Sequence, residues 1–330
     1  MRIKKIQSGK LNNLIAIFDT SIGSDNMGDF IIMDYCNNII NNLFKENKKI
    51  YVSTHTKNNK KINKNIRFSK YKIMCGTNIL SSSIDTVGGW EIYRNDYANY
   101  YNICLLGVGW NNYEDDINKF TKIFLNNILN KKLIHSVRDS YTEKKLREIG
   151  FINVLNTACP TMWGLTKNFC ELIPQVKGEY VLTTITDYRK DIELDQYMLN
   201  ILQDNYKKVY IWIQGKYDLE YLKTLIDLNR IICINSSLDE LDQVLDKNIS
   251  LDYIGTRLHA GIRALNHKRR SIIIAIDNRA KEISMDTNLP ILERNNLKSD
   301  LENKINSKFK TEIILPTQNI VKWKKQFTEL

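Results

Sequence analysis

Short apolar runs alternate with segments of helical apolar spacing along most of the chain. The first run is Leu14–Phe18, and between Asp29 and Phe44 apolar residues recur at helical spacing for about four turns. The same succession of run and helix recurs as far as Ser271–Ile276. Strands that alternate with helices of this length are typical of a mostly parallel, doubly wound sheet. We therefore expect an α/β fold.

The remaining expected elements follow this alternation. Further strands are expected at Ile50–Ser53, Tyr71–Met74, Ile103–Leu106, Leu133–Val137, Tyr180–Thr184, Val209–Ile213, Ile231–Ile234 and Tyr253–Ile254. Further helices are expected at Ile117–Leu129, Thr142–Glu148, Leu194–Leu202, Leu219–Leu228, Leu238–Leu245, Leu258–Leu265 and Gln318–Phe327.

The length of 330 residues exceeds the size at which one core usually stops growing, so two domains are expected. Thr157–Gly178 carries two of the four prolines and has no clean period, which is typical of a linker. We expect Rossmann-like domains at residues 1–165 and 166–315, facing a central cleft as in GT-B glycosyltransferases. The C-terminal helix, residues 316–330, could pack back on the first domain.

Composition excludes several classes of protein. With 43% hydrophobic and 26% charged residues the chain is globular, and no apolar run approaches the roughly 18–20 residues that span a bilayer. The N-terminal apolar run, about five residues ending at Asp19, is too short for a signal-peptide core, so we expect a cytoplasmic protein. The six cysteines form no CxxC pair and no His lies at metal-ligand spacing. This favours reduced, buried thiols over disulfides or a zinc site.

The net charge of +11 is concentrated in Lys45–Arg67, especially Lys57–Asn65. A nucleic-acid arm would need aromatic stacking residues, which this stretch lacks, so we expect no nucleic-acid partner. A solvated loop accounts for the stretch, and so does weak attraction to an anionic membrane surface or a phosphate-bearing acceptor. Peripheral membrane association therefore remains open at this stage.

The stretch Asp252–Lys281 combines a strand end, a helix start and three groups suited to anion chemistry. Arg257 follows Gly255 and Thr256 at the helix start, where a guanidinium fork and free backbone N–H groups both favour an anion. His259 and Arg263 follow on the same helix, and an imidazole beside bound anions suits a general acid. The alternative is that Arg257 caps a neighbouring loop and His259 is a core histidine.

A second arginine, Arg138, ends the strand Leu133–Val137. Asp139 or Ser140 can cap the next helix, which would leave Arg138 to point toward the cleft. Pairing of Arg138 with a surface carboxylate is an equally good interpretation. The neighbouring His135, Ser136 and Asp139 are triad residue types, but adjacency in sequence is not triad geometry.

Several strand ends also carry small residues that allow close approach of a ligand to the backbone. Gly23–Asp29 has the composition of a phosphate cradle but lacks a GxGxxG or Walker motif. Similar turns occur at Gly76–Asn78, Gly88–Gly89 and Gly107–Gly109.

Taken together, these motifs resemble the polysaccharide pyruvyl transferase family from about Leu14 to Pro290. The resemblance rests on Asn26-Met27-Gly28-Asp29, Gly107-Val108-Gly109, Ser136-Val137-Arg138-Asp139-Ser140 with Leu146 and Gly150, Cys159-Pro160, and Thr256-Arg257-Leu258-His259-Ala260 with Lys281. Two loops depart from the family's pattern, Cys75-Gly76-Thr77-Asn78 and Asp277-Asn278-Arg279-Ala280-Lys281, and both could touch the acceptor.

The resemblance implies transfer of the enolpyruvyl unit of phosphoenolpyruvate to a sugar of a cell-surface polysaccharide or its lipid-linked precursor. It implies an acceptor side in the N-terminal domain, a donor side in the C-terminal domain and no cofactor. Arg138 and Arg257 would hold the donor's phosphate and carboxylate, Leu258 would add its backbone, and His259 would be the general acid. The other expected substrate-binding residues are Asn26, Gly28, Asp29, Gly107, Gly109, Arg263 and Lys281.

Two other functions compete with this one. A GT-B glycosyltransferase with a nucleotide-sugar donor would share the fold, although the Glu-x7-Glu pair common in retaining enzymes is absent around Asp277–Asp286. A non-catalytic binding protein that kept the fold is disfavoured by the joint presence of Arg138, Arg257 and His259.

Overall fold

Two compact units make up the chain, each with its own parallel sheet. The structure is a computed structural model, and it describes residues 13–86, 90, 99–114 and 116–328. One unit comprises residues 1–24, 32–160 and 316–330, and the other comprises 25–31 and 161–315. We call them the N-terminal and C-terminal units.

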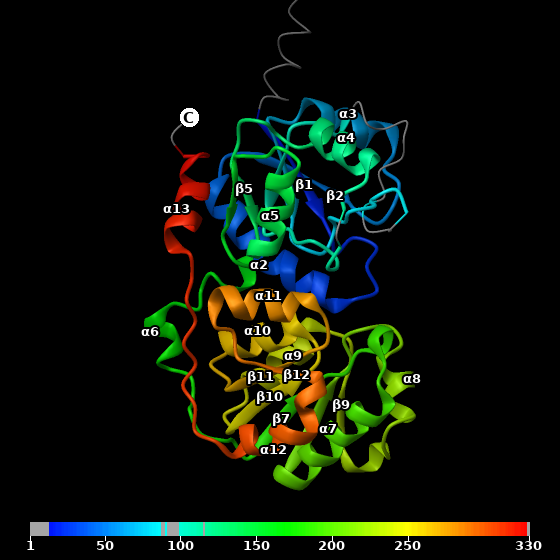
Figure 1. The fold of residues 1–330 in the computed structure, drawn as a ribbon, viewed down its shortest axis with the longest axis vertical. Helices are drawn as coiled ribbons and strands as arrows, with labels where there is room; N and C mark the ends of the chain where they lie inside the picture. Colours follow the sequence, from blue (N-terminus) through cyan, green and yellow to red (C-terminus); the bar gives the residue numbers. More distant parts are fainter. Residues whose placement is uncertain (1–12, 87–89, 91–98, 115, 329–330) are drawn as a thin grey trace, which may run out of the picture. The chain divides into compact units, whose positions relative to one another are not determined.

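In its described ranges the N-terminal unit has six strands, all in parallel pairings, of which Figure 1 labels β1, β2 and β5. Four of them form a sheet in the order β2-β1-β3-β4, and β5 and β6 form a parallel pair. Gly107 N donates to Ser136 O at 3.0 Å, which joins the end of β4 to β5. The strands are β1 Leu14–Asp19, β2 Lys48–Ser53, β3 Tyr71–Cys75, β4 Ile103–Leu106, β5 His135–Val137 and β6 Val154–Asn156.

Four helices of the described part of this unit lead from one strand to a later one, and a fifth ends the chain. They are α2 Met27–Leu43, whose first residues group with the C-terminal unit, α3 Lys60–Phe68, α4 Lys119–Ile128, α5 Ser140–Glu148 and α13 Thr317–Lys325. The last of these, α13, lies with the N-terminal unit although it ends the chain. The Gln326 side chain fixes it there, because its amide pairs with both Ile134 N (2.7 Å) and Ile134 O (3.0 Å).

The C-terminal unit contains a six-stranded sheet in which every pair of neighbours is parallel, in the order β12-β11-β10-β7-β8-β9. Numbered within the unit this is the order 3-2-1-4-5-6 of doubly wound dinucleotide-binding folds. The strands are β7 Tyr180–Thr183, β8 Lys208–Trp212, β9 Ile232–Ile234, β10 Leu251–Gly255, β11 Ser271–Ala275 and β12 Ile291–Glu293.

Helices cover both faces of this sheet, which explains its continuous apolar strands. Figure 1 shows α10 and α11 along one face and α7 and α12 along the other. The helices are α6 Lys167–Cys170, α7 Ile192–Asn205, α8 Asp218–Lys223, α9 Leu238–Leu245, α10 Leu258–Asn266, α11 Asn278–Thr287 and α12 Leu297–Asn306. All five residues of β10 and of β11 are buried.

Two segments expected to be loops are helical instead. The lysine-rich stretch Lys57–Asn65 runs into α3, which Asn59 caps by accepting a hydrogen bond from Ile62 N. Similarly, Asp277 is the N-cap of α11 and accepts from Arg279 N, so Lys281 lies on a helix. Helices of this kind are short and polar, so their few apolar residues give no clear helical pattern in the sequence. Packing of those few residues against a sheet stabilises the helix despite its weak intrinsic helix propensity.

The expectation of buried thiols holds for five cysteines and is wrong for Cys233, which is exposed on the edge strand β9. All six cysteines carry reduced thiols. The described ranges contain no helix long and apolar enough to cross a membrane.

Candidate active site

The carboxyl ends of β7 and β10 lie side by side at the centre of the C-terminal sheet. From β7 the chain winds toward β9, and from β10 it winds the opposite way toward β12, so the strand order reverses between them. Ligands of doubly wound folds bind in the crevice at such a reversal, outside the strand ends. Arg257, which follows β10, therefore lies where the fold itself predicts a ligand.

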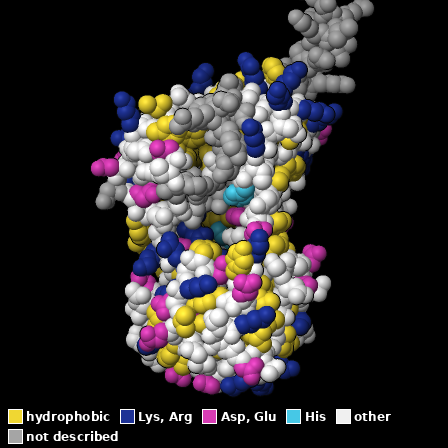
Figure 2. Space-filling view, turned by 90° about the vertical axis from the view of Figure 1, so that its right-hand side faces the viewer, with side chains coloured by type: hydrophobic (Ala, Val, Ile, Leu, Met, Phe, Trp, Pro, Cys, Tyr) yellow, Lys and Arg dark blue, Asp and Glu magenta, His cyan; other side chains and the backbone are white. Residues whose placement is uncertain are grey.

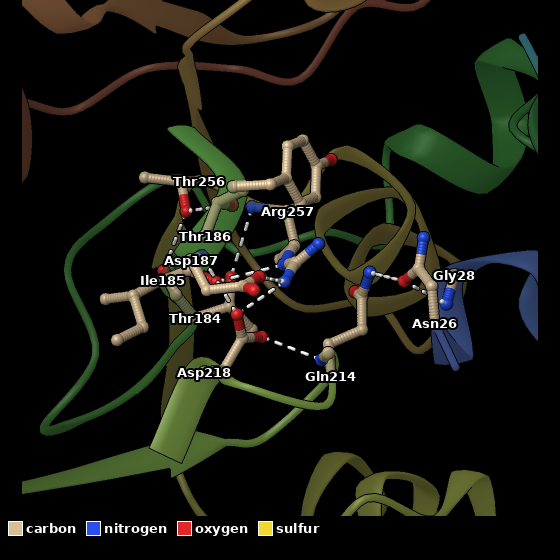
Figure 3. Close-up of polar contacts among 12 residues, drawn as sticks. Asn26, Gly28, Thr184, Ile185, Thr186, Asp187, Gln214, Asp218, Thr256 and Arg257 are labelled. Atoms are coloured by element: carbon tan, nitrogen blue, oxygen red, sulfur yellow. Dashed lines mark hydrogen bonds and ion pairs between the residues drawn. The ribbon is translucent and has the colours of Figure 1, made fainter. Parts of the chain in front are cut away.

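The guanidinium of Arg257 is held by three acceptors from the C-terminal unit (Figure 3). Its Nε donates to Ile185 O at 3.0 Å, and its Nη2 donates to Asp187 Oδ1 at 3.1 Å and to Asp218 Oδ1 at 2.5 Å. The side chain is 3% exposed, and its guanidinium carbon lies 5.0 Å from the centre of the Tyr188 ring. Because every one of these partners fixes its orientation, Arg257 is pre-positioned rather than mobile.

One terminal nitrogen of Arg257 remains available. Within the described ranges Nη1 has no hydrogen-bond partner, and Figure 3 shows this nitrogen pointing away from the two carboxylates, toward Gln214. Gly215 provides the room, because a Cβ built on it would lie 2.4 Å from Nη2. The arrangement leaves a fixed cationic donor at the strand ends.

Asp218 is the central acceptor of this cluster. It is fully buried and accepts from Gly215 N (2.7 Å) and Asp187 N (3.0 Å) as well as from Arg257. Burial raises the pKa of Asp218, and the Arg257 charge and the backbone N–H groups oppose that rise. One guanidinium therefore faces two carboxylates, and an added anion must compete with Asp187 and Asp218 for Arg257.

The segment that precedes α2 is bonded to the end of β8 through a chain of amides (Figure 3). Gly28 N donates to Asn26 Oδ1 at 3.0 Å, which fixes the orientation of the Asn26 amide, and Gln214 Nε2 donates to the same oxygen at 2.8 Å. Gln214 Oε1 is therefore turned to the other side, where it is buried without a partner among the described residues. Asn26, Gly28 and Asp29, expected on the N-terminal domain, group with the C-terminal unit.

His259 occupies the second position of α10, directly after Leu258. Both side chains are buried, at 6% exposure each, and the Arg257 carbonyl already accepts from Gly261 N in the first helical turn. Arg257 is the N-cap of this helix but makes no side-chain cap, so its guanidinium is directed to the strand ends instead. The start of α10 thus places a cation and an imidazole within three consecutive positions.

Two other predicted binding residues of this unit have carboxylate partners. Arg263 donates from Nε and Nη2 to Asp242 at 2.6 and 2.5 Å. Burial raises the pKa of Asp242, but hydrogen bonds from Arg263 and His267 overcome this and hold it at about 2. Lys281 pairs with Glu293 at 2.6 Å on the surface. The structure therefore does not bring Arg263 or Lys281 to Arg257 as free cations.

In the N-terminal unit, the predicted residues Gly107, Gly109 and Arg138 lie together at the end of β4. Arg138 is 2% exposed; its Nε donates to Asp139 at 3.0 Å and its Nη2 donates to Trp110 O at 3.2 Å. A Cβ built on Gly109 would lie 2.1 Å from the guanidinium carbon, so a larger residue there would force the Arg138 guanidinium to shift. Gly107 has φ of +66° and packs directly against the Pro160 ring. A donor-binding role for Arg138 stays a prediction.

His135 is a structural histidine. Its Nδ1 accepts from Leu105 N at 3.2 Å, so its Nε2 carries the proton and donates to Asn130 O at 2.8 Å. Burial lowers the pKa of His135 to about 4, which keeps the ring neutral. Asp139 caps α5 by accepting from Thr142 N, so these residues form no triad.

Asp187, Asp218 and Gln214 were not predicted from the sequence. Each follows a buried strand, β7 or β8, which is the same signal that pointed to Arg257. Nothing in the sequence indicated that they contact Arg257, because Asp187 and Asp218 are separated from it by 70 and 39 positions in the chain. No group of three or more metal-ligating side chains is found in the part of the chain that the structure describes.

Known proteins share this architecture. A family model described as Polysaccharide pyruvyl transferase matches residues 26–278. UDP-GlcNAc 2-epimerase of Methanocaldococcus jannaschii, solved with UDP-GlcNAc and UDP, is similar with a TM-score of 0.54 and 13% identity, over 96% of this chain and 98% of that one. The expected fold class, α/β with two doubly wound Rossmann-like units of the GT-B type, is confirmed.

Other solved structures align less closely. UDP-GlcNAc 2-epimerase from Neisseria meningitidis, bound to UDP-GlcNAc, has a TM-score of 0.46 and 10% identity over 96% of this chain and 98% of that one. The lipopolysaccharide outer core galactosyltransferase WaaB, in its apo form, has a TM-score of 0.46 and 12% identity over 89% of each chain. No curated protein sequence matches the chain.

Proposed function

Because this chain belongs to the polysaccharide pyruvyl transferase family, we propose that it transfers the enolpyruvyl unit of phosphoenolpyruvate to a sugar. The acceptor is a cell-surface polysaccharide or its lipid-linked precursor, and the reaction takes place in the cytoplasm. The products are a pyruvate ketal and free phosphate. No cofactor takes part in this scheme, since phosphoenolpyruvate is itself the donor.

The observation that carries the proposal is the position of Arg257 and His259 at the strand-order reversal of the C-terminal sheet. Phosphoenolpyruvate carries a phosphate and a carboxylate, and guanidinium groups match both. Arg257 offers Nη1 from a fixed position, and the first turn of α10 adds backbone N–H groups, with Leu258 among them. Hydrogen-bond donors that are already in position can stabilise the charge that develops in the transition state of a transfer reaction.

The chemistry needs one proton donor. His259 protonates C3 of the enol phosphate, which becomes the methyl group and leaves a cationic centre at C2. A sugar hydroxyl forms a bond to C2, the C2–O bond to phosphate breaks, and a second hydroxyl of the same sugar closes the ketal. Of the two hydroxyl protons released, one restores His259 and the other leaves with phosphate. General acid catalysis of this kind contributes about 100- to 10,000-fold.

The test is an incubation with phosphoenolpyruvate at about 1 mM, the upper end of typical KM values, and a panel of saccharide acceptors. Phosphate release and ketal formation should occur together. His259→Asn should lower kcat about 100-fold or more while sparing donor binding. His267→Asn, at the other end of the same helix, is the matched control and should retain the rate of the unmodified protein.

Arg257→Lys keeps a charge but loses the guanidinium fork, so donor affinity should fall about 10- to 100-fold, as expected for one charge-assisted hydrogen bond. Circular dichroism must show that this variant is folded. Stabilisation by UDP, CMP or GDP sugars, with none by phosphoenolpyruvate, would overturn the proposal in favour of a nucleotide-sugar glycosyltransferase. Normal turnover in His259→Asn would contradict the role of the imidazole.

A further inference from the structure

Positive charge is gathered in one segment of the N-terminal unit. Between Glu46 and Asp85 the chain has no Asp or Glu and nine basic residues, Lys48, Lys49, Lys57, Lys60, Lys61, Lys64, Arg67, Lys70 and Lys72. Figure 2 shows Lys and Arg side chains along the upper end of the view, the end that carries α3 in Figure 1. A local excess of this size gives α3 a strongly positive surface potential.

Helix α3 has one face in the core and one basic face. Ile66 is fully buried and Ile62 packs beside it against the same core cluster. Lys60, Lys64 and Arg67 follow at i, i+4 and i+7, which places them together on the exposed side of the helix. Of the carboxylates in the described ranges, none pairs with these three cations.

This charge pattern opposes the stability of the helix itself. Like charges at i, i+4 are destabilising, and cations in a first turn oppose the helix dipole. The first turn of α3 contains Lys60 and Lys61 and no acidic residue. By contrast, α5 pairs Glu143 with Arg147 at i, i+4. An anionic partner would turn the unfavourable pattern of α3 into a favourable one.

An apolar side chain and a hollow accompany the cations. Phe68 is 47% exposed at the end of α3, and the Arg67 guanidinium carbon lies 5.9 Å from the centre of its ring. A hollow of about 370 Å³ is lined by Lys60, Asn63, Lys64, Arg67, Phe68 and Asn99. Basic residues around an exposed aromatic ring suit the boundary between lipid headgroups and acyl chains.

We propose that this basic face of α3 docks the protein on a bilayer that contains anionic phospholipid. The headgroup phosphates pair with Lys60, Lys64 and Arg67, and Phe68 enters the headgroup boundary. Single-stranded nucleic acid fits less well, because successive bases need several stacking rings and α3 offers one. The inference does not depend on the donor or the transfer chemistry, since vesicle binding is measured without phosphoenolpyruvate.

The test is co-sedimentation of the full chain with vesicles of phosphatidylcholine alone or with phosphatidylglycerol added. The triple change Lys60→Gln, Lys64→Gln, Arg67→Gln should weaken binding to anionic vesicles about 100-fold, at about fivefold per basic residue. The matched control is Lys207→Gln, Lys298→Gln, Lys310→Gln, which removes the same charge from surface ion pairs of the C-terminal unit. The control should bind as the unmodified protein does.

Three further binding measurements test whether the ligand is the anionic bilayer. Binding should fall steeply as salt rises to 1 M, where the screening length drops to about 3 Å. Phe68→Ser should weaken it without changing the salt dependence, and soluble glycerol phosphate should compete poorly, because a bilayer presents many phosphates at once. Equal losses in both triple variants, binding to phosphatidylcholine alone, or tighter binding to single-stranded oligonucleotides would overturn the proposal.

Discussion

The cluster around Arg257 predicts a large and specific effect of Asp218→Asn. Asp218 is fully buried and accepts from Arg257 Nη2, Gly215 N and Asp187 N. An asparagine keeps the shape and can still accept from two of these groups. Its Nδ2, however, faces the Gly215 N–H group at 2.7 Å, where the native oxygen accepts a bond.

The magnitude follows from two losses. A hydrogen bond to a charged partner contributes about 1.5–3 kcal/mol, and a buried N–H left unpaired costs about 1–3 kcal/mol. Asp187 still accepts from Arg257 at 3.1 Å and limits the loss. We expect Asp218→Asn to lower the free energy of unfolding by about 3 kcal/mol, the lower end of the range for breaking a buried ion pair. Asp187→Asn, at 15% side-chain exposure, should lower it by about 1 kcal/mol.

Urea unfolding followed by circular dichroism measures both variants, with the stability change read from the midpoint at an unchanged m-value. If Asp218→Asn is no less stable than Asp187→Asn, the assignment of Asp218 as the central support of Arg257 is wrong.

Three further predictions concern the scaffold. Burial lowers the pKa of His135 from 6.5 to about 4, so between pH 4 and pH 6.5 the unfolded state binds more protons than the folded state. The free energy of unfolding should therefore fall by about 3 kcal/mol from pH 7 to pH 4. His135→Gln should flatten the pH dependence of the urea midpoint. Gly107→Ala should prevent stable folding, because φ is +66° and a Cβ would lie 2.1 Å from Pro160 Cδ. Gly150→Ala, with φ of +97° and open space around it, should lower the free energy of unfolding by only about 1 kcal/mol of backbone strain, seen as a small fall in the thermal midpoint. Arg263→Lys should lower the free energy of unfolding by about 1–2 kcal/mol through its pair with Asp242 and leave the donor dissociation constant unchanged; a weaker donor affinity at unchanged stability would restore Arg263 to the site.

The fold was predictable from the sequence because its central strands are buried on both faces. Runs such as Leu14–Phe18 and Ile272–Ile276 are apolar throughout, which is typical of strands in a parallel sheet covered on both faces. The helices α3 and α11 escaped prediction because each presents only two or three apolar residues to a sheet and is otherwise polar. Their stability comes from packing, which local composition does not report.

The site was predictable only in part. Arg257 and His259 lie at a strand-to-helix turn, and that local pattern alone predicted that they lie at the carboxyl ends of the strands. The partners of Arg257 are set by the order of the strands, which brings the ends of β7, β8 and β10 together. The ion pair between Arg263 and Asp242 likewise depends on how two helices pack, so the residues next to Arg263 in the sequence do not predict it.

In the proposed reaction, His259 protonates C3 of phosphoenolpyruvate bound beside Arg257. The most direct test is to run the reaction in D2O and to measure the mass of the pyruvyl methyl group in the ketal product. We expect one added deuteron per ketal, released phosphate in equal amount, and loss of both in His259→Asn while phosphoenolpyruvate still binds. A ketal without deuterium, or labelled ketal formed at the normal rate by His259→Asn, would contradict it.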